Sequence, residues 1–270
     1  MYKIFIYTFY LKNLFKCLII VFNNMIIGLL LFLLFGINHL VHDIDVYYEF
    51  LFIYIITFNL YYVVYYLLNR YISSFTNINP EHKKMYVIKN YMKSFYLASL
   101  CLTLRYFFYG EYDIYFIKRC AIYYIINDMI GLLLVDKLPT TTIIHHSTTS
   151  LCGLIILTKD NNNLDILTLI VLYGIFSSLS FSVNFYLGYR VHSTNNLHKY
   201  YLSTIANSVY IISCLINWLI QLYLFYGIFL LIPIYHTIIY LAFIYSVVSD
   251  DIILIKWLYN DMYHYKKIVN

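Results

Sequence analysis

Eight apolar segments, most of them about 20 residues long, follow one another along this chain of 270 residues. A helix of about 20 apolar residues crosses the hydrocarbon core of a bilayer, and a helix satisfies all its backbone hydrogen bonds internally. The pattern therefore predicts an all-α membrane protein with about eight transmembrane helices. Their approximate limits are Cys17–Ile37, Val46–Leu68, Met92–Tyr109, Cys120–Val135, Thr142–Thr158, Leu164–Leu187, Tyr201–Leu224 and Tyr226–Ile255.

Composition agrees with this class, because 62% of the residues are hydrophobic and only 11% are charged, which is too apolar for a soluble surface. The net charge of +5 is spread over several loops and suits the anionic face of a membrane better than a nucleic-acid groove. The five cysteines lie singly in apolar stretches, so they indicate neither a disulfide framework nor a zinc site. We expect no nucleic-acid partner, no metal and no cofactor.

Basic residues alternate from loop to loop. They gather at the N-terminus, after the second helix, after the sixth helix and at the C-terminus, whereas the opposite loops carry most of the acidic residues. By the positive-inside rule both termini are predicted to be cytoplasmic, in a multi-pass protein of the endoplasmic reticulum or another internal membrane. The hydrophilic stretch Arg70–Asn90 is predicted to be a loop, because Pro80 interrupts any helix there. Lys118 and Arg119 oppose the charge pattern, so either they snorkel outward or the fourth helix begins after them.

Ionisable and polar side chains recur at helical spacing inside three successive apolar segments, where such groups are costly and usually functional. They form the stripes Tyr124, Asp128 and Gly131; His145, His146 and Thr149; and Tyr173, Ser177, Ser180 and Asn184. All three stripes lie at similar depth from the predicted cytoplasmic end. We expect them to converge on one cavity in the cytoplasmic half of the bilayer.

These residues carry a resemblance to a known family. The order Tyr123-Tyr124-x-x-x-Asp128, a short basic break and then a helix opening with His145-His146 resembles the TLC-domain family, which includes translocating-chain-associating proteins, ceramide synthases and a ceroid-lipofuscinosis membrane protein. A further segment, Ser178 to Asn184 followed by Arg190, is similar to the family's acidic-x-Ser segment, with Ser178 at the acidic position. The resemblance implies a six-helix TLC-type barrel around a lipid-sized cavity. It divides the chain into an N-terminal basic segment and anchor helix (1–46), a TLC-like transmembrane domain (47–259) and a basic tail (260–270).

The chain departs from the longer ceramide-synthase motif. His145-His146-x-x-Thr149 matches its beginning, but the apolar run from Leu151 to Ile156 stands where the motif continues with polar residues. The sequence His42-Asp43-Ile44-Asp45 is similar to its end but precedes the His pair. The resemblance therefore implies a short, non-ceramide-synthase-like member of the family.

Two classes of function remain open. As a lipid-handling protein, the chain would bind a membrane lipid in a cavity lined by Tyr124, Thr149, Ser177, Ser180 and Asn184, in lipid homeostasis. As an enzyme, it would be an acyltransferase of ceramide-synthase type, with acyl-CoA and a sphingoid base as partners and with His145, His146 and Asp128 as catalytic residues. An imidazole near neutral pKa can take a proton from the attacking nucleophile, while a carboxylate orients the ring.

Three other classes of interpretation apply to this sequence. The polar groups could be purely structural, with the histidines capping a helix and the hydroxyls bonding backbone carbonyls. A metal-dependent hydroxylase or desaturase would need several His-rich boxes, and only two pairs cluster among the nine histidines. Nucleotide-binding and nucleophile-elbow motifs are absent from the sequence.

Overall fold

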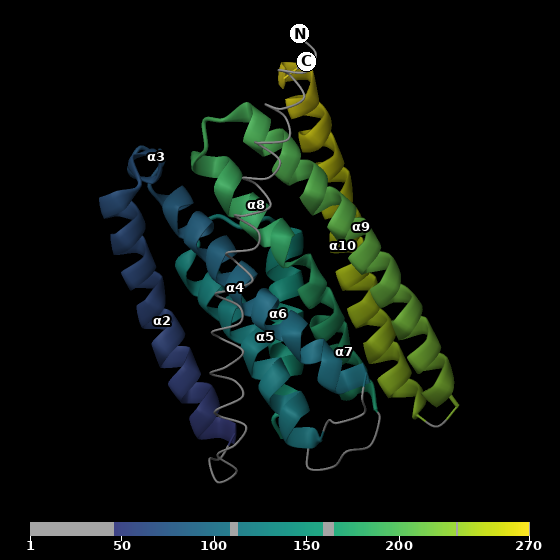
Figure 1. Cartoon of the computed structure of the whole chain (residues 1–270). Helices are drawn as coiled ribbons and strands as arrows, with labels where there is room; N and C mark the ends of the chain where they lie inside the picture. The colour runs from purple at the N-terminus through teal and green to yellow at the C-terminus, as the bar shows by residue number, and fades with distance from the viewer. Residues whose placement is uncertain (1–45, 109–112, 159–164, 231, 270) are drawn as a thin grey trace.

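The computed structural model describes residues 46–108, 113–158, 165–230 and 232–269, and every regular element within them is a helix (Figure 1). The elements are α2 (Val46–Tyr71), α3 (Ser73–Thr76), α4 (His82–Phe108), α5 (Ile114–Leu134), α6 (Thr140–Ile156), α7 (Ile166–Ser177), the 3-10 turn η1 (Ser178–Ser180), α8 (Phe181–His192), α9 (Asn196–Ile228) and α10 (Ile234–Val269). The helix expected at Cys17–Ile37 lies outside the described residues.

Four helical segments in the described part of the chain are long and apolar enough to cross a membrane: α2, the α7–α8 segment, α9 and α10. The outward faces of α2, α9 and α10 carry exposed Leu, Ile and Tyr side chains. Apolar surface of that extent on long helices is a face for lipid. The prediction of an all-α integral membrane protein is thus confirmed at this level.

Three predicted boundaries are wrong. The division expected between Leu224 and Tyr226 falls later, because α9 continues to Ile228 and α10 begins at Ile234. The loop expected over Arg70–Asn90 ends earlier than predicted, because α4 begins at His82. Pro80 precedes this helix, so its missing N–H breaks no hydrogen bond within α4. The fourth predicted helix begins earlier than expected, at Ile114, so Lys118 and Arg119 lie within α5 and are buried. They neither snorkel outward nor precede the helix.

Asx side chains fix the starts of three helices. Asp113 accepts a hydrogen bond from the Phe116 amide at 2.7 Å, and Asp165 and Asn195 cap α7 and α9 in the same way. Each cap satisfies one of the backbone N–H groups that the first turn of a helix leaves without a partner. Residues 260–269, expected as a basic tail, continue α10 as helix.

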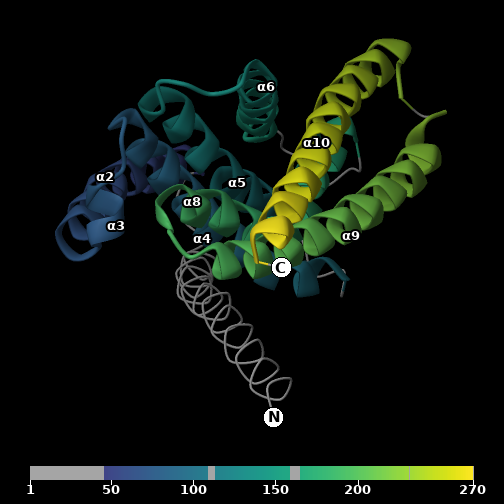
Figure 2. The ribbon, with the colours of Figure 1, turned by 90° about the horizontal axis from the view of Figure 1, so that it is seen from above.

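The helices pack in a closed order around an interior space. Each of α4, α5, α6, α10, α9 and α8 packs against the next, and α8 returns to α4, while α7 lies against α4, α5, α6 and α9. Seen from above, α2 and α3 lie at one edge of the molecule and α9 with α10 at the opposite edge (Figure 2). Among the described helices, α2 packs mainly against α3, α4 and α5, so it stands outside this order.

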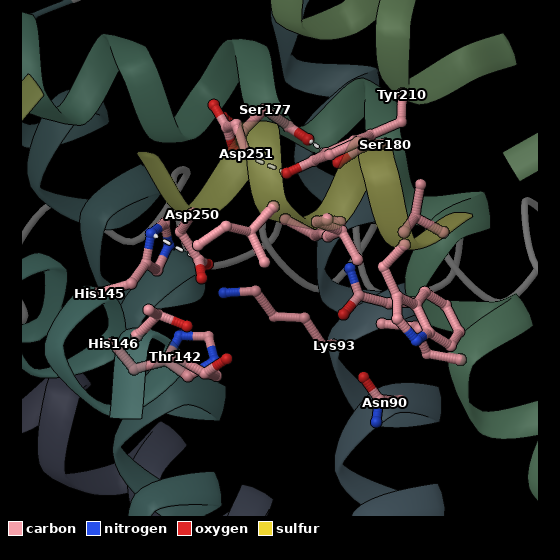
Figure 3. Close-up of a pocket in the computed structure, with 18 of the residues that line it drawn as sticks. Asn90, Lys93, Thr142, His145, His146, Ser177, Ser180, Tyr210, Asp250 and Asp251 are labelled. Carbon is pink, nitrogen blue, oxygen red and sulfur yellow. Dashed lines mark hydrogen bonds and ion pairs between the residues drawn. The ribbon is translucent and has the colours of Figure 1, made fainter. Parts of the chain in front are cut away.

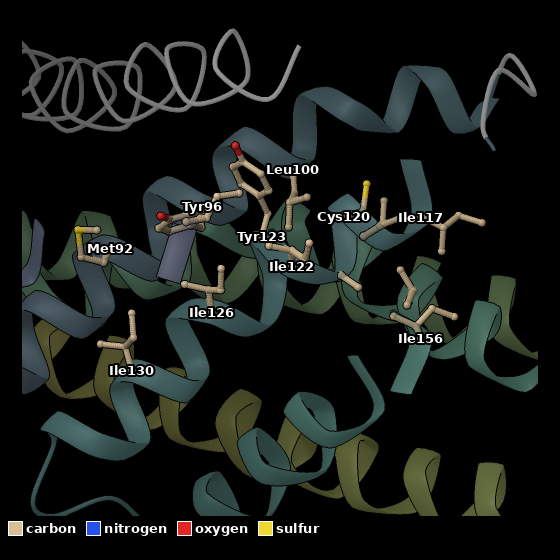
Figure 4. Close-up of a cluster of buried hydrophobic side chains, with 14 of the residues drawn as sticks. Met92, Tyr96, Leu100, Ile117, Cys120, Ile122, Tyr123, Ile126, Ile130 and Ile156 are labelled. Atoms are coloured by element: carbon tan, nitrogen blue, oxygen red, sulfur yellow. The ribbon is translucent and has the colours of Figure 1, made fainter. Parts of the chain in front are cut away.

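The main apolar core lies between α2, α4, α5 and α7 (Figure 4). Helix α5 is buried on nearly all sides, with Ile122, Ile126 and Ile130 fully enclosed. Small residues allow the close packing, since a Cβ at Gly153 of α6 would lie 2.4 Å from Cγ2 of Ile125. Burial of this kind stabilises a protein mainly through dense packing.

A polar stripe attaches α2 to this core. Glu49, Thr57 and Tyr61 recur at multiples of four residues and are buried. Glu49 Oε2 lies 2.9 Å from Arg119 Nε, Tyr61 donates to Asn127 Oδ1 at 2.7 Å, and Thr57 is hydrogen-bonded to Tyr96. Interhelical polar contacts of this sort hold membrane helices together where hydrophobicity alone does not distinguish protein from lipid.

Candidate functional site: a charged cavity inside the helix bundle

A cavity of about 290 Å³ lies inside the packed helices, at the end of the bundle that carries the α3–α4, α5–α6 and α8–α9 connections. Every helix of the closed order contributes side chains to it. The lining repeats at helical spacing: Tyr86, Lys89, Asn90, Lys93 and Leu97 on α4; Thr141, Thr142, His145 and His146 on α6; Tyr210, Ser213, Cys214 and Asn217 on α9; Asp250, Asp251, Ile253, Leu254 and Trp257 on α10. One face of each helix therefore points inward.

A linked set of charged groups forms one wall. Asp128, fully buried on α5, accepts a hydrogen bond from Lys93 Nζ at 2.8 Å, and its other oxygen lies 3.1 Å from His146 Nδ1. His146 Nε2 lies 3.1 Å from Lys89 Nζ. Because a lysine ammonium can only donate, Nε2 accepts, and the proton of the neutral ring then sits on Nδ1, facing the carboxylate. Lys93 also donates to the Tyr124 carbonyl and lies 3.8 Å from the centre of that ring.

Lys89 is hydrogen-bonded to His146 and Lys93 to Asp128, and the two pairs meet where His146 Nδ1 lies 3.1 Å from Asp128 Oδ1, so the four side chains form one linked structural group. Gly131 of α5 makes room for it. A Cβ at that position would lie 2.9 Å from Cγ of Lys89, so the aliphatic stem of the lysine crosses α5 where there is no side chain.

His145 has a different environment. Its Nδ1 lies 3.8 Å from Asp250 Oδ2, and the ring stands edge-on to that of His146 with 5.3 Å between the centroids (Figure 3). Both His145 and Asp250 line the cavity and are only partly buried. This pair places an imidazole beside a carboxylate, the two kinds of group that general-base chemistry uses, at a distance longer than a hydrogen bond.

Asp251, the neighbour of Asp250, is held by neutral donors. It accepts hydrogen bonds from Tyr173 at 2.5 Å, Tyr210 at 2.6 Å and Trp218 Nε1 at 3.3 Å. The carboxylate is therefore fixed against α7 and α9 by groups that carry no positive charge.

Arg190 completes the charged lining from the end of α8. Its guanidinium stacks over the Trp257 ring at 4.0 Å, a cation–π contact. Within the described part of the chain, no carboxylate lies within ion-pair distance of it, and its Nε is buried without a hydrogen-bond partner.

Six of the eight residues singled out from the sequence line this cavity, and the other two do not. The six are Tyr124, His145, His146, Ser177, Ser180 and Asn184. Asp128 lies behind the wall and reaches the cavity only through Lys93 and His146. Thr149 faces a smaller hollow, and its hydroxyl donates to the His145 carbonyl at 2.9 Å, which is the structural use expected of a helical threonine.

Sequence reasoning missed the lysines of α4 and the carboxylates of α10. The sequence pattern predicts a loop at Lys89 and gives no role to Lys93, although the two are four residues apart on one face of α4. Asp250 and Asp251 follow the apolar run Leu241–Val248, where a pair of carboxylates is as unusual as the His pair. The rule that singled out Asp128 would also have found them.

Among the described residues, no group of three or more His, Cys, Asp or Glu side chains is arranged to hold a metal ion. Comparison with protein-family models, curated proteins and solved structures gives no match for this chain. The functional argument therefore depends on the geometry of the cavity.

Proposed function

We propose that the chain is a multi-pass membrane protein of TLC type that binds or handles a membrane lipid in this cavity, as part of lipid homeostasis. In this proposal it has eight transmembrane helices. Six spans form the TLC-type barrel: α4, α5, α6, the α7–α8 segment, α9 and α10. The N-terminal helix and α2 lie outside it, and both termini are cytoplasmic.

The observation that supports this best is the concentration of charge inside an otherwise apolar bundle. Lys89, Lys93 and Asp251 are each less than 10% exposed and line the same cavity. A charged side chain at membrane depth costs roughly 2.5–3.5 kcal/mol even on insertion scales, and such residues usually serve a ligand path. Replacing buried ions by well-packed apolar side chains is often neutral or stabilising, so packing alone does not account for these charges.

The cavity also has a route to the bilayer. Thr141 of α6 and Ile253 of α10 both line it, and both are exposed at the surface. The opening therefore lies between the start of α6 and the middle of α10, beside exposed apolar side chains of both helices such as Ile144 and Ile252. An amphiphile can place its polar group inside and leave its chains in lipid.

Lipid that remains with the purified protein tests the proposal. We expect one lipid class to be retained in near-stoichiometric amounts by the wild type and by Asp136→Asn, which makes the same chemical change at an exposed position on the α5–α6 connection. We expect Asp250→Asn to lose it, as measured by mass spectrometry of the extracted lipids. Equal retention by all three proteins, or none by the wild type, contradicts the proposal.

A second function, acyl transfer, is favoured by one specific observation, the proximity of His145 to Asp250 in the cavity wall. His145 would take the proton from an amine or hydroxyl as its N or O bonds to the carbonyl carbon of an acyl thioester. The C–S bond would then break, and the proton would pass to the leaving thiolate. In this proposal His146 and Asp128 position His145 and the lysines and do not themselves transfer protons.

Complementation separates the two functions. We expect the chain not to restore growth to cells that lack ceramide synthase, because the second half of the ceramide-synthase motif is missing. Restored growth with new ceramide species, lost in His145→Ala, would establish the acyltransferase instead.

A further inference from the structure

The cavity is lined by charges of both signs, which come from different helices. Lys89 and Lys93 line it from α4 and Arg190 from α8, while Asp250 and Asp251 line it from α10. Figure 3 labels Lys93 and the two carboxylates. Helices α4 and α10 both pack against α7, and each contributes one inward face to the lining of the cavity.

These charges are only partly matched within the protein. Lys93 is neutralised by Asp128 at 2.8 Å. Lys89, 5% exposed, has a neutral imidazole as its nearest polar partner, and Arg190 has an aromatic ring. In the described part of the chain no carboxylate lies within 4.0 Å of either cation.

The two carboxylates of α10 also lack a lysine or arginine partner. Asp251, 7% exposed, is held only by phenol and indole donors, and Asp250 faces His145 at 3.8 Å. Neither has a lysine or arginine within 4.0 Å in the described residues. Two cations and two anions thus line one cavity without an ion pair between them in the described residues, and two of the four, Lys89 and Asp251, are buried, where an unmatched charge is expensive.

From this arrangement we infer that the cavity takes the head group of a zwitterionic amphiphile, with its phosphate toward Lys89 and Arg190 and its ammonium toward Asp250 and Asp251. The inference rests on the proposed lipid-binding function and specifies its ligand. Such a head group supplies each wall with the opposite charge and adds no net charge to the membrane interior. An anionic or a cationic head group would satisfy one wall and leave the other unmatched.

Size agrees with a head group as the occupant. A volume of about 290 Å³ is at the lower limit of ordinary ligand cavities, which span roughly 300–1,000 Å³. Two acyl chains do not fit beside a head group in that space. They would leave between α6 and α10, past Thr141 and Ile253.

The chain offers its own reporter for the test, because it has two tryptophans and both touch this site: Trp257 lines the cavity and Trp218 donates to Asp251. Purified full-length protein in a mild detergent is titrated with four probes while tryptophan emission is followed. Dihexanoyl phosphatidylethanolamine carries both charges, dihexanoyl phosphatidylglycerol carries phosphate only, decylamine carries ammonium only, and free phosphoethanolamine carries both charges without chains.

We expect the phosphatidylethanolamine to bind at least about tenfold more tightly than each of the other three probes. Asp250→Asn should bind phosphatidylethanolamine and phosphatidylglycerol equally tightly. Arg190→Gln should bind both phospholipids more weakly and bind decylamine with unchanged affinity. Asp136→Asn should match the wild type in every titration. The ranking for the wild type needs no variant, so it stands even if a substitution prevents folding.

Equal binding of phosphatidylethanolamine and phosphatidylglycerol, or tighter binding of either single-charge probe, overturns this inference and leaves lipid binding intact. Tightest binding of free phosphoethanolamine overturns it in favour of a soluble zwitterion. Binding of none of the four, together with no co-purifying lipid, overturns the proposed function as well.

Discussion

Removing the carboxylate of Asp128 should destabilise the protein strongly, because it leaves Lys93 buried and uncompensated. Asp128 is 0% exposed and Lys93 is 4% exposed, with 2.8 Å between Oδ2 and Nζ. Breaking a buried ion pair from one side costs about 3–5 kcal/mol. At roughly 2–4 °C per kcal/mol for a chain of this size, Asp128→Asn should lower Tm by roughly 6–20 °C.

Thermal unfolding in detergent, followed by the helical circular dichroism signal, measures this shift. The double variant Asp128→Asn, Lys93→Met should recover much of the loss, since it removes both charges together and leaves no unmatched ion. The control Asp136→Asn, at an exposed position, should stay within about 0.5 kcal/mol of the wild type. If the double variant is as unstable as the sum of its single variants, the two groups are not coupled and the reasoning fails.

Three further predictions concern packing and topology. Glu49→Gln should lower the unfolding free energy by up to about 3–5 kcal/mol, because it weakens the buried contact with Arg119 that joins α2 to α5; an unchanged Tm would contradict the contact. Gly153→Ala should lower the unfolding free energy by about 1–3 kcal/mol, because the added Cβ overpacks against Ile125. Gly227→Ala should be neutral or stabilising, because nothing lies within 4 Å of its added Cβ. Equal Tm shifts in the two variants would contradict this packing. Tags at the two termini should be equally accessible to protease from the cytoplasmic side, and unequal protection would reject the proposed topology.

Most of the helices could be predicted from sequence because hydrophobic length is a strong local signal. The segments that begin at Val46 and Tyr201 lie within α2 and α9, and the one that begins at Thr142 matches α6 to within two residues. Boundaries were harder where charges lie inside helices. From the sequence, Lys89 and Arg119 resemble loop or interface residues. A hydropathy pattern shows that a charged residue is costly in lipid, but it does not show whether another helix carries a partner for it, as α2 carries Glu49 for Arg119.

The candidate cavity could be anticipated in part for the same reason. Spacing alone put Asp128 and His146 on inward faces of neighbouring helices, and the structure places them 3.1 Å apart. Spacing could not show that Asp250, more than 100 residues later, faces His145, because that contact depends on which helices are neighbours in space. Nor could it show that Thr149 faces a different hollow, since one residue of rotation on a helix is about 100°.

A structure of the full-length protein purified with its native lipid into nanodiscs tests the central claim most directly. The account predicts density for a lipid head group between the lysines of α4 and the carboxylates of α10, continuous with chain density that leaves between α6 and α10. A cavity that holds only water, with α6 and α10 packed closed and lipid confined to the outer faces, would contradict it.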